Sequence, residues 1–308
     1  SQAGTCAAPS NLSPLTAAGA TARFGPRGTC IYDESVTSYA ELHPLQRSRW
    51  ASYRHSLWLL TTRDLKVRYS TSALGYVWSI LDPLLMSAIY WFVFTVVFQR
   101  PFGTTPYIVF LLAALLPWMW FNGAVSDSTR AFLREAKLIR STKIPRTIWV
   151  NRIVLSKGIE FLLALPVLAG IALVFGLQGE LELHWQLVCF PLAIVLQAIL
   201  TGIGLIVAPL VVFFRDLERA VKLILRFLFY ASPIVYGVSN LPESLHFWAA
   251  FNPLSGIFGL YRAGFFPDEL DWFNVGVAAA MSLGSSSGPA VSSPSLAAAS
   301  SRSSAVCS

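Results

Sequence analysis

The chain has 308 residues, a formal net charge of +7 and 55% hydrophobic residues, with a mean hydropathy of +0.57. Only 13% of the residues are charged, against about 25% in soluble domains. This composition excludes an ordinary soluble domain and favours a membrane protein. The cations lie beside apolar segments, so the positive charge indicates a membrane rather than nucleic acid as the partner. The four cysteines are scattered and predict neither a disulfide scaffold nor a metal site.

The first part of the chain changes character near residue 45. Residues 1–44 are rich in Ser, Thr, Ala, Gly and Pro without periodicity, which predicts a disordered cytoplasmic tail. Residues 48–69 are basic and aromatic, and apolar side chains recur there at spacings of three, four and three: Trp50, Tyr53, Leu57 and Leu60. That spacing predicts an amphipathic helix lying in the membrane interface. A soluble amphipathic helix is the alternative.

Five long apolar segments follow, each near or above the ~20 residues that a helix needs to cross a bilayer. They are residues 73–98, 106–125, 147–177, 185–214 and 219–238. Residues 241–266 are also apolar, but Asn252, Pro253 and Gly256 interrupt them, which predicts two short re-entrant helices. A sixth apolar segment begins at residue 272 and is cut short by the Ser- and Ala-rich residues 285–308.

Lys and Arg favour the cytoplasmic side of a membrane. The five crossings place nearly all cations on one side and leave only Arg100 and Arg262 in the other loops. We therefore expect a multi-pass protein of the plasma membrane with a cytoplasmic N-terminus and a 45–284 membrane domain.

Residues 130–146, RAFLREAKLIRSTKIPR, form the most basic segment between two apolar ones. Arg130, Arg134 and Lys137 share one face of a predicted helix, which Pro145 ends. A charged helical loop in the cytosol suits docking by a partner protein. The alternative is that the segment only sets the membrane orientation and anchors itself to phospholipids, with no protein partner.

Charges inside the predicted spans are few. Lys157 and Glu160 are three residues apart and are expected to pair. Asp82 precedes Pro83, and the role of its charge stays open. Arg226 is compatible with a side chain that snorkels to the inner interface.

No GxxxxGK[ST] loop occurs in the chain, so the sequence gives no phosphate-binding loop for ATP. The four histidines are isolated and no HExxH motif is present. These observations argue against an independent enzyme.

Three stretches carry a resemblance to a known family: RDLKVRYSTSALGYVWSILDPLL (63–85), LLPWMWFNGAVSDSTRAFLREAKLIRSTKIPR (115–146) and residues 213–266, which begin FFRDLERAVKLILRFLFYASP. They resemble the membrane subunits of ABC-2 type exporters, nearest to those that export O-antigen and other polysaccharides. Within that group they are most similar to the permeases for lipid-linked galactan of arabinogalactan-type cell walls.

The resemblance implies an all-α integral membrane protein with six transmembrane helices, which works as a homodimer with two cytosolic ABC ATPase subunits. The partner would bind ATP and Mg, and this chain would hold no cofactor. Residues 130–146 correspond to the coupling helix, 48–69 to a gate helix and 241–266 to the outer re-entrant helices. A channel at the dimer interface would pass a polyprenyl-diphosphate-linked glycan.

The resemblance and the charge pattern together nominate three sets of residues. Contacts to the ATPase are expected from Arg130, Arg134, Glu135, Lys137, Arg140, Lys143, Arg146, Asp216 and Arg219. Contacts to the lipid diphosphate are expected from Arg47, Arg49, Arg54, Arg63, Lys66 and Arg68, whose alternative role is to bind membrane lipids. Aromatic rings that could stack on sugars in the channel are Tyr76, Trp78, Tyr90, Trp91, Trp118, Trp120, Phe121, Phe229, Tyr230, Tyr236, Trp248, Phe251 and Tyr261. Their alternative role is to face lipid or fill the core.

Two other functions compete with polysaccharide export. An ABC-2 efflux permease for drugs or small lipids is the first alternative, because channel width cannot be read from sequence. A passive channel ranks behind it. The family has a complete sixth span, so we hypothesise that residues 285–308 are a reading-frame artefact, which an intact-mass measurement would test.

Overall fold

The computed structural model describes residues 22–24, 30–32, 49–70, 75–97, 106–141, 144–238 and 242–286. The chain divides into two units, residues 1–52 and 53–308. In the first unit, strands β1 (Ala22–Phe24) and β2 (Cys30–Tyr32) pair in antiparallel fashion, with Arg23 opposite Ile31. The composition of residues 1–44 predicted no regular structure. The strands contain aromatic and β-branched residues, which favour extended backbone.

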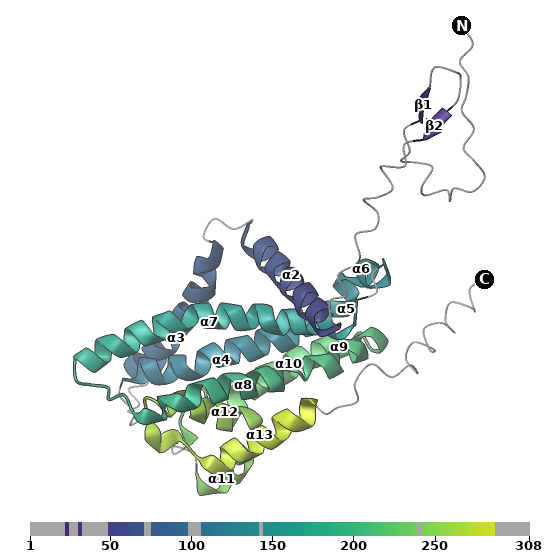
Figure 1. Ribbon diagram of the computed structural model, residues 1–308. Coiled ribbons are helices and arrows are strands. Elements are labelled where there is room, and N and C mark those ends of the chain that lie inside the picture. The colour runs from purple at the N-terminus through teal and green to yellow at the C-terminus, as the bar shows by residue number, and fades with distance from the viewer. Residues whose placement is uncertain are drawn as a thin grey trace. The chain divides into compact units, whose positions relative to one another are not determined.

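All other described elements are helices (Figure 1). In chain order they are α2 (Arg49–Ser70), η2 (Gly75–Val77), α3 (Trp78–Trp91), η3 (Phe92–Val97), α4 (Tyr107–Ser128), α5 (Ala131–Arg134), α6 (Ala136–Ser141), α7 (Thr147–Leu177), η4 (Trp185–Cys189), α8 (Phe190–Thr201), α9 (Gly204–Phe213), α10 (Leu217–Ala231), α11 (Glu243–Ala250), α12 (Pro253–Arg262), η6 (Pro267–Glu269) and α13 (Trp272–Ser286).

Four helical segments among the described residues are long and apolar enough to cross a membrane. They are Ile80–Val97, Tyr107–Ser128, Thr147–Leu177 and Trp185–Phe213. The third covers the whole apolar segment 147–177 as one helix. The fourth contains a break at Gly202, where a Cβ would lie 2.7 Å from the carbonyl oxygen of Ile199.

The fifth and sixth apolar segments form shorter helices. The segment expected to be helical over 219–238 is α10, which has 15 residues and ends at Ala231. It ends there because Ser232 is extended, as a residue before proline usually is. α13 also has 15 residues, fewer than the ~20 that span the hydrocarbon. Residues 241–266 contain two short helices, and the Asn252 side chain caps the second by accepting a hydrogen bond from Leu254 N–H.

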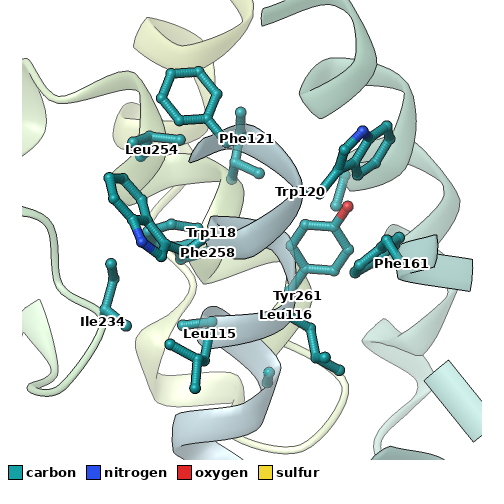
Figure 2. Packing of buried hydrophobic residues seen from close by; sticks show 14 of the residues in the cluster. Leu115, Leu116, Trp118, Trp120, Phe121, Phe161, Ile234, Leu254, Phe258 and Tyr261 are labelled. Carbon is teal, nitrogen blue, oxygen red and sulfur yellow. The ribbon is translucent and has the colours of Figure 1, made fainter. Parts of the chain in front are cut away.

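Helix α4 forms the centre of the core. It packs along α7 and also contacts α3, α9 and α12, and its residues Val109–Phe110 are fully buried. Figure 2 shows Trp118 on one side of this helix and Trp120 on the other, where Trp120 lies with Phe161 and Tyr261. The ring centroids of Trp120 and Phe161 are 5.1 Å apart. Both tryptophans are thus packed against neighbouring helices, each on a different side of α4.

The irregular segment 232–238 lies at the end of α4 that is farther from residues 130–146. Arg262, which the sequence placed in an outer loop, is instead buried in α12. Its guanidinium donates to the carbonyls of Phe110 (3.2 Å), Pro233 (2.8 Å) and Ile234 (2.7 Å) and stacks 3.5 Å from the Phe110 ring centroid. The Arg262 side chain therefore satisfies the carbonyls of Pro233 and Ile234, which lie outside any helix, as apolar surroundings require.

Two more side chains hold the same segment. The Tyr107 hydroxyl donates to the carbonyl of Val235 at 2.8 Å. The Glu269 carboxylate accepts from Val238 N–H at 3.2 Å. A Cβ on Gly237 would overlap that carboxylate, so glycine is required for this close approach.

Candidate functional site

The basic segment, residues 130–146, does not form the single helix expected from the sequence. It contains two short helices, α5 and α6, with Glu135 between them at φ −106° and ψ 19°. Thr147 begins the next helix directly after the segment, and Pro145 lies outside both neighbouring helices. The Glu135 side chain explains why the break is tolerated, because it binds residues on two other helices.

A cluster of four charges joins the basic segment to α2 and α7. The Glu135 carboxylate accepts from Arg63 of α2 at 3.1 Å and from Arg152 of α7 at 3.1 Å. Arg152 also donates to Asp64 of α2 at 3.2 Å. We call Arg63, Asp64, Glu135 and Arg152 the four-charge cluster. It has no net charge, and it links α2 to the basic segment and α7, which lie 72 to 88 residues further along the chain.

Arg152 is the buried member of this cluster. It is 4% exposed, and its guanidinium carbon lies 4.9 Å from the ring centroid of Trp149. Burial raises the pKa of Asp64, and the attraction of Arg152 and then Arg63 opposes that rise. Two carboxylates on one buried guanidinium are the arrangement expected of a charge that has lost most of its water.

A second ion-pair group ties the end of α2 to α4 and α7. Arg68 donates to Glu160 of α7 at 2.6 Å and to Asp127 of α4 at 3.4 Å. Lys157 donates to the same Glu160 at 2.9 Å, which confirms the predicted pairing of Lys157 with Glu160. The sequence did not predict that Arg68 would share this carboxylate.

A third group connects the basic segment to α10. Glu218 accepts from Arg130 at 2.7 Å and from Lys222 at 2.6 Å. The hydrogen bonds from Arg130 and then Lys222 lower the pKa of Glu218 to about 2. Arg130 is 46% exposed as a side chain, so this group lies at the surface.

The remaining nominated charges of the basic end fall into two classes. Those with exposed side chains are Arg54, Lys66, Arg134, Lys137, Arg146, Asp216 and Arg219. Arg49 begins α2 and Arg140 lies in α6, whereas Arg47 and Lys143 lie outside the described residues. The exposed set provides a surface of mostly positive charge that a protein partner could contact.

Helix α2 partly buries three residues of its predicted apolar stripe, Tyr53, Leu57 and Leu60. Thr61 and Leu65 are its buried residues, whereas Trp50 and Trp58 are 68% and 60% exposed. The Tyr53 hydroxyl accepts a hydrogen bond from Asn151 of α7 at 2.8 Å. Polar and ionic contacts with α4, α7 and the basic segment thus hold one side of α2.

A groove of about 480 Å³ lies between α3, α4 and α10. Residues from all three helices line it: Met86, Tyr90, Leu115, Trp118, Met119, Asn122, Ser126, Lys222, Leu225, Arg226, Phe229 and Tyr230. Phe229 contacts three other rings, with centroid distances of 5.8 Å to Tyr90, 5.5 Å to Trp118 and 5.1 Å to Tyr230. We call this space the aromatic groove.

A smaller hollow of about 290 Å³ lies on the other side of α4. Its lining includes Trp78 and Asp82 of α3, Trp120 of α4, and the ion-paired Arg68 and Lys157. Asp82 is therefore exposed to a partly polar space.

The structure separates the thirteen nominated aromatic residues. Only Tyr90, Trp118, Phe229 and Tyr230 line the aromatic groove. Trp118, Trp120, Phe121 and Tyr261 are at most 5% exposed and belong to the core, so Trp118 borders the groove as a core residue. The other described side chains, Trp78, Trp91, Tyr236, Trp248 and Phe251, lie elsewhere, and Tyr76 is part of η2.

Sequence reasoning missed Asp64, Asp127 and Glu218, which complete the ion-pair groups. In the long-range hydrogen bonds that Arg68, Arg130 and Arg152 donate to carboxylates, donor and acceptor are 59 to 92 residues apart in the sequence. One signal was available, because an unpaired arginine inside a predicted span such as Arg152 needs a carboxylate nearby.

Comparison with known proteins identifies relatives across most of this region. The ABC-2 type transporter family model matches residues 55–266. The chain is 36% identical over 215 residues to the O-antigen export system permease protein RfbA of Klebsiella pneumoniae, covering 70% of this chain and 81% of that protein. It is 30% identical over 221 residues to the protein of the same name from Myxococcus xanthus, covering 71% and 83%. The polysialic acid transport protein KpsM of Escherichia coli is 24% identical over 232 residues, covering 72% and 86%.

Proposed function

The chain belongs to the ABC-2 type transporter family, and we propose that it is the permease subunit of an exporter for a polyprenyl-diphosphate-linked polysaccharide. The exporter moves this substrate from the cytoplasm across the plasma membrane. The observation that carries the proposal is the similarity to permeases named for O-antigen and polysialic acid transport over about 70% of the chain.

The aromatic groove supports this choice of substrate class. Rings of Trp and Tyr offer flat apolar faces with polar edges, and such faces suit sugar rings. Tyr90, Trp118 and Tyr230 present these rings from three different helices. Weak stacking on several rings suits a polymer that must slide rather than stay bound.

A separate ABC ATPase supplies the energy in this proposal. Two ATPase subunits bind ATP and Mg and dock on the basic segment of two permease subunits. Support comes from the exposed charges Arg134, Lys137 and Arg146 and from the four-charge cluster, which would pass movement of Glu135 to α2. In this arrangement α2 is the gate helix and α11 and α12 are the re-entrant helices, with α10 and α13 as the fifth and sixth crossings.

We also propose that the polysaccharide is a galactan, which rests on the resemblance of residues 63–85, 115–146 and 213–266. The galactan is the finer part of the proposal and can fail while polysaccharide export stands. Efflux of drugs or small lipids is the competing function.

Depletion in cells followed by membrane fractionation tests the proposal. Lipid-linked polymer should accumulate on the cytoplasmic face, and galactose should be its main sugar. Re-expression of the wild-type chain should clear the polymer, and a variant with Arg134 and Lys137 both changed to Glu should not. Unchanged polymer together with lost efflux of small compounds would instead support the competing function.

A further inference from the structure

The two long walls of the aromatic groove change from aromatic to polar in the same direction. On α10, Lys222, Arg226 and Phe229 are spaced by four and three residues, so they share one helical face. On α4, Trp118 and Ser126 are eight residues apart and also share a face. Each of the two helices therefore lines one side of the groove with a row of side chains.

The two helices run in opposite directions along the groove. Trp118 of α4 contacts Phe229 near the end of α10, and Arg130, just after α4, pairs with Glu218 at the beginning of α10. The aromatic parts of both walls therefore face each other, and Ser126 lies nearer to the cationic part. One end of the groove is aromatic and the other is polar and positively charged.

The charge of this polar end is not balanced by the groove itself. No carboxylate is among the residues that line the groove. Lys222 is bonded to Glu218, but Glu218 is shared with Arg130. Arg226 has an exposed side chain and no hydrogen bond or ion pair within the described part of the chain. Arg226 therefore presents a positive charge that no carboxylate in the described part of the chain pairs with, and this position favours an anionic ligand.

Arg63 and Arg68 of α2 are less suited to this task, and Arg54 and Lys66, although exposed, do not line the groove. Arg63 is bonded to Glu135 and Arg68 to Glu160 and Asp127. A ligand would have to break these ion pairs before it could bind those two arginines. Arg226 requires no such exchange.

We propose that Arg226, assisted by Lys222, binds the diphosphate of the lipid-linked glycan at the polar end of the aromatic groove. Diphosphate carries at least two negative charges, and an arginine forms paired hydrogen bonds to phosphate oxygens. The sugar attached to the diphosphate then lies toward Trp118, Phe229 and Tyr230, about one helical turn beyond Arg226 on α10. This inference rests on the proposed function and transfers the diphosphate contact from α2 to α10.

Binding to the whole permease–ATPase complex in phosphatidylcholine nanodiscs tests the inference. The probes are undecaprenyl diphosphate, undecaprenyl monophosphate and undecaprenol, and the readout is a native mass spectrometry titration. Wild type should bind the diphosphate most tightly. Arg226→Gln should weaken diphosphate binding by about tenfold or more, and Arg226→Lys should weaken it less, with little change for undecaprenol in either variant.

Arg215→Gln is the matched control, because Arg215 is an exposed cation just before α10 that does not line the groove. It should bind the diphosphate as wild type does. The thermal midpoint of Arg226→Gln should also equal that of wild type, since Arg226 makes no ion pair in the described residues.

Three outcomes would overturn the inference or its premise. If Arg226→Gln and the double variant Arg226→Gln/Lys222→Gln both bind the diphosphate as tightly as wild type, Arg226 is not part of the site. The proposed exporter function would then still stand. Displacement of the probe by phosphatidylglycerol at equal headgroup concentration would make the groove a general site for anionic lipid. Wild-type complex that neither binds nor moves any polyprenyl diphosphate would remove the proposed function itself.

Discussion

The two ends of α4 are secured by different interactions. At the basic end, ion pairs between side chains join α2, the basic segment, α7 and α10, and Arg130 is 46% exposed within them. At the opposite end, Arg262 is 1% exposed and donates only to backbone carbonyls. The first kind of contact is screened by salt and can exchange partners. The second kind of contact, between buried Arg262 and backbone carbonyls, cannot be replaced by hydrogen bonds to water, because solvent does not reach this side chain.

This difference teaches where the protein can move. Alternative carboxylates are close together at the basic end, so Arg63 and Arg152 can shift while staying paired. Among the described residues, the side-chain donor to the carbonyls of Pro233 and Ile234 is Arg262 alone. We therefore expect the basic end to carry movement and the irregular segment 232–238 to stay fixed unless α12 moves with it.

The largest effect is expected from removing the buried guanidinium. Arg262→Met removes the side-chain donors of the Pro233 and Ile234 carbonyls and the contact with Phe110, and should lower the free energy of unfolding by about 3 kcal/mol or more. Thermal unfolding of the purified protein in detergent measures this. Arg215→Gln serves as the exposed control. An unchanged midpoint for Arg262→Met would contradict the contrast between the two ends.

A smaller loss is expected from crowding the contact between α12 and α13. A Cβ on Gly256 would overlap the backbone of Asn274 and Val275, so Gly256→Ala should cost about 1–3 kcal/mol. Gly276→Ala is the matched control, because a Cβ there meets no atom within 4 Å. That variant should be neutral or slightly stabilising. The same unfolding assay compares them, and equal midpoints would refute the close approach.

Breaking the four-charge cluster should have a moderate effect on stability and a larger effect on the coupling of ATP hydrolysis to polymer transport. Glu135→Gln leaves Arg152 with Asp64 as its only carboxylate and should cost about 1–2 kcal/mol. ATP hydrolysis by the reconstituted complex should continue while polymer transport falls, because Arg63 is no longer tied to the basic segment. Arg134→Gln, one residue away and exposed, should keep wild-type stability. Loss of hydrolysis and transport in equal proportion would count against transmission through Glu135.

The smallest effect belongs to the exposed group at Glu218. Arg130→Gln should shift the midpoint by less than about 2 °C, and the shift should shrink in high salt. The pKa of Glu218 is lowered from 4.5 to about 2, so its contribution is fully present above pH 4.5 and is lost as pH falls toward 2. Midpoints of wild type and Glu218→Gln measured between pH 7 and pH 3 should therefore converge only below about pH 4.5.

Uninterrupted apolar segments were the most predictable part of the fold. Residues 147–177 form the single helix α7, although Pro166 lies inside it. Asn252 and Pro253 correctly indicated two short helices between 241 and 266. The early end of α10 was harder to place. Residues 232–238 are as apolar as a membrane helix, but their backbone is held by hydrogen bonds to the side chains of Tyr107, Arg262 and Glu269.

The site was less predictable than the fold for a physical reason. A basic segment is visible in the sequence, but the carboxylates that bind it come from other helices. Glu218, for example, lies 88 residues from Arg130. Short spacing predicted the pair of Lys157 and Glu160, whereas no local pattern could place Asp64 beside Arg152. Aromatic type alone also failed to separate exposed groove residues such as Tyr230 from core residues such as Tyr261.

The position of Trp118 and Trp120 makes α4 a partition between two compartments. One ring borders the aromatic groove and the other borders the hollow that contains Asp82, and Met119 lines both. A small turn of this helix about its long axis would enlarge one compartment while narrowing the other. Substrate bound in the aromatic groove would therefore change the shape of the hollow beside Lys157 and Arg68 on the opposite side of α4. The hollow would respond to the bound substrate without contacting it.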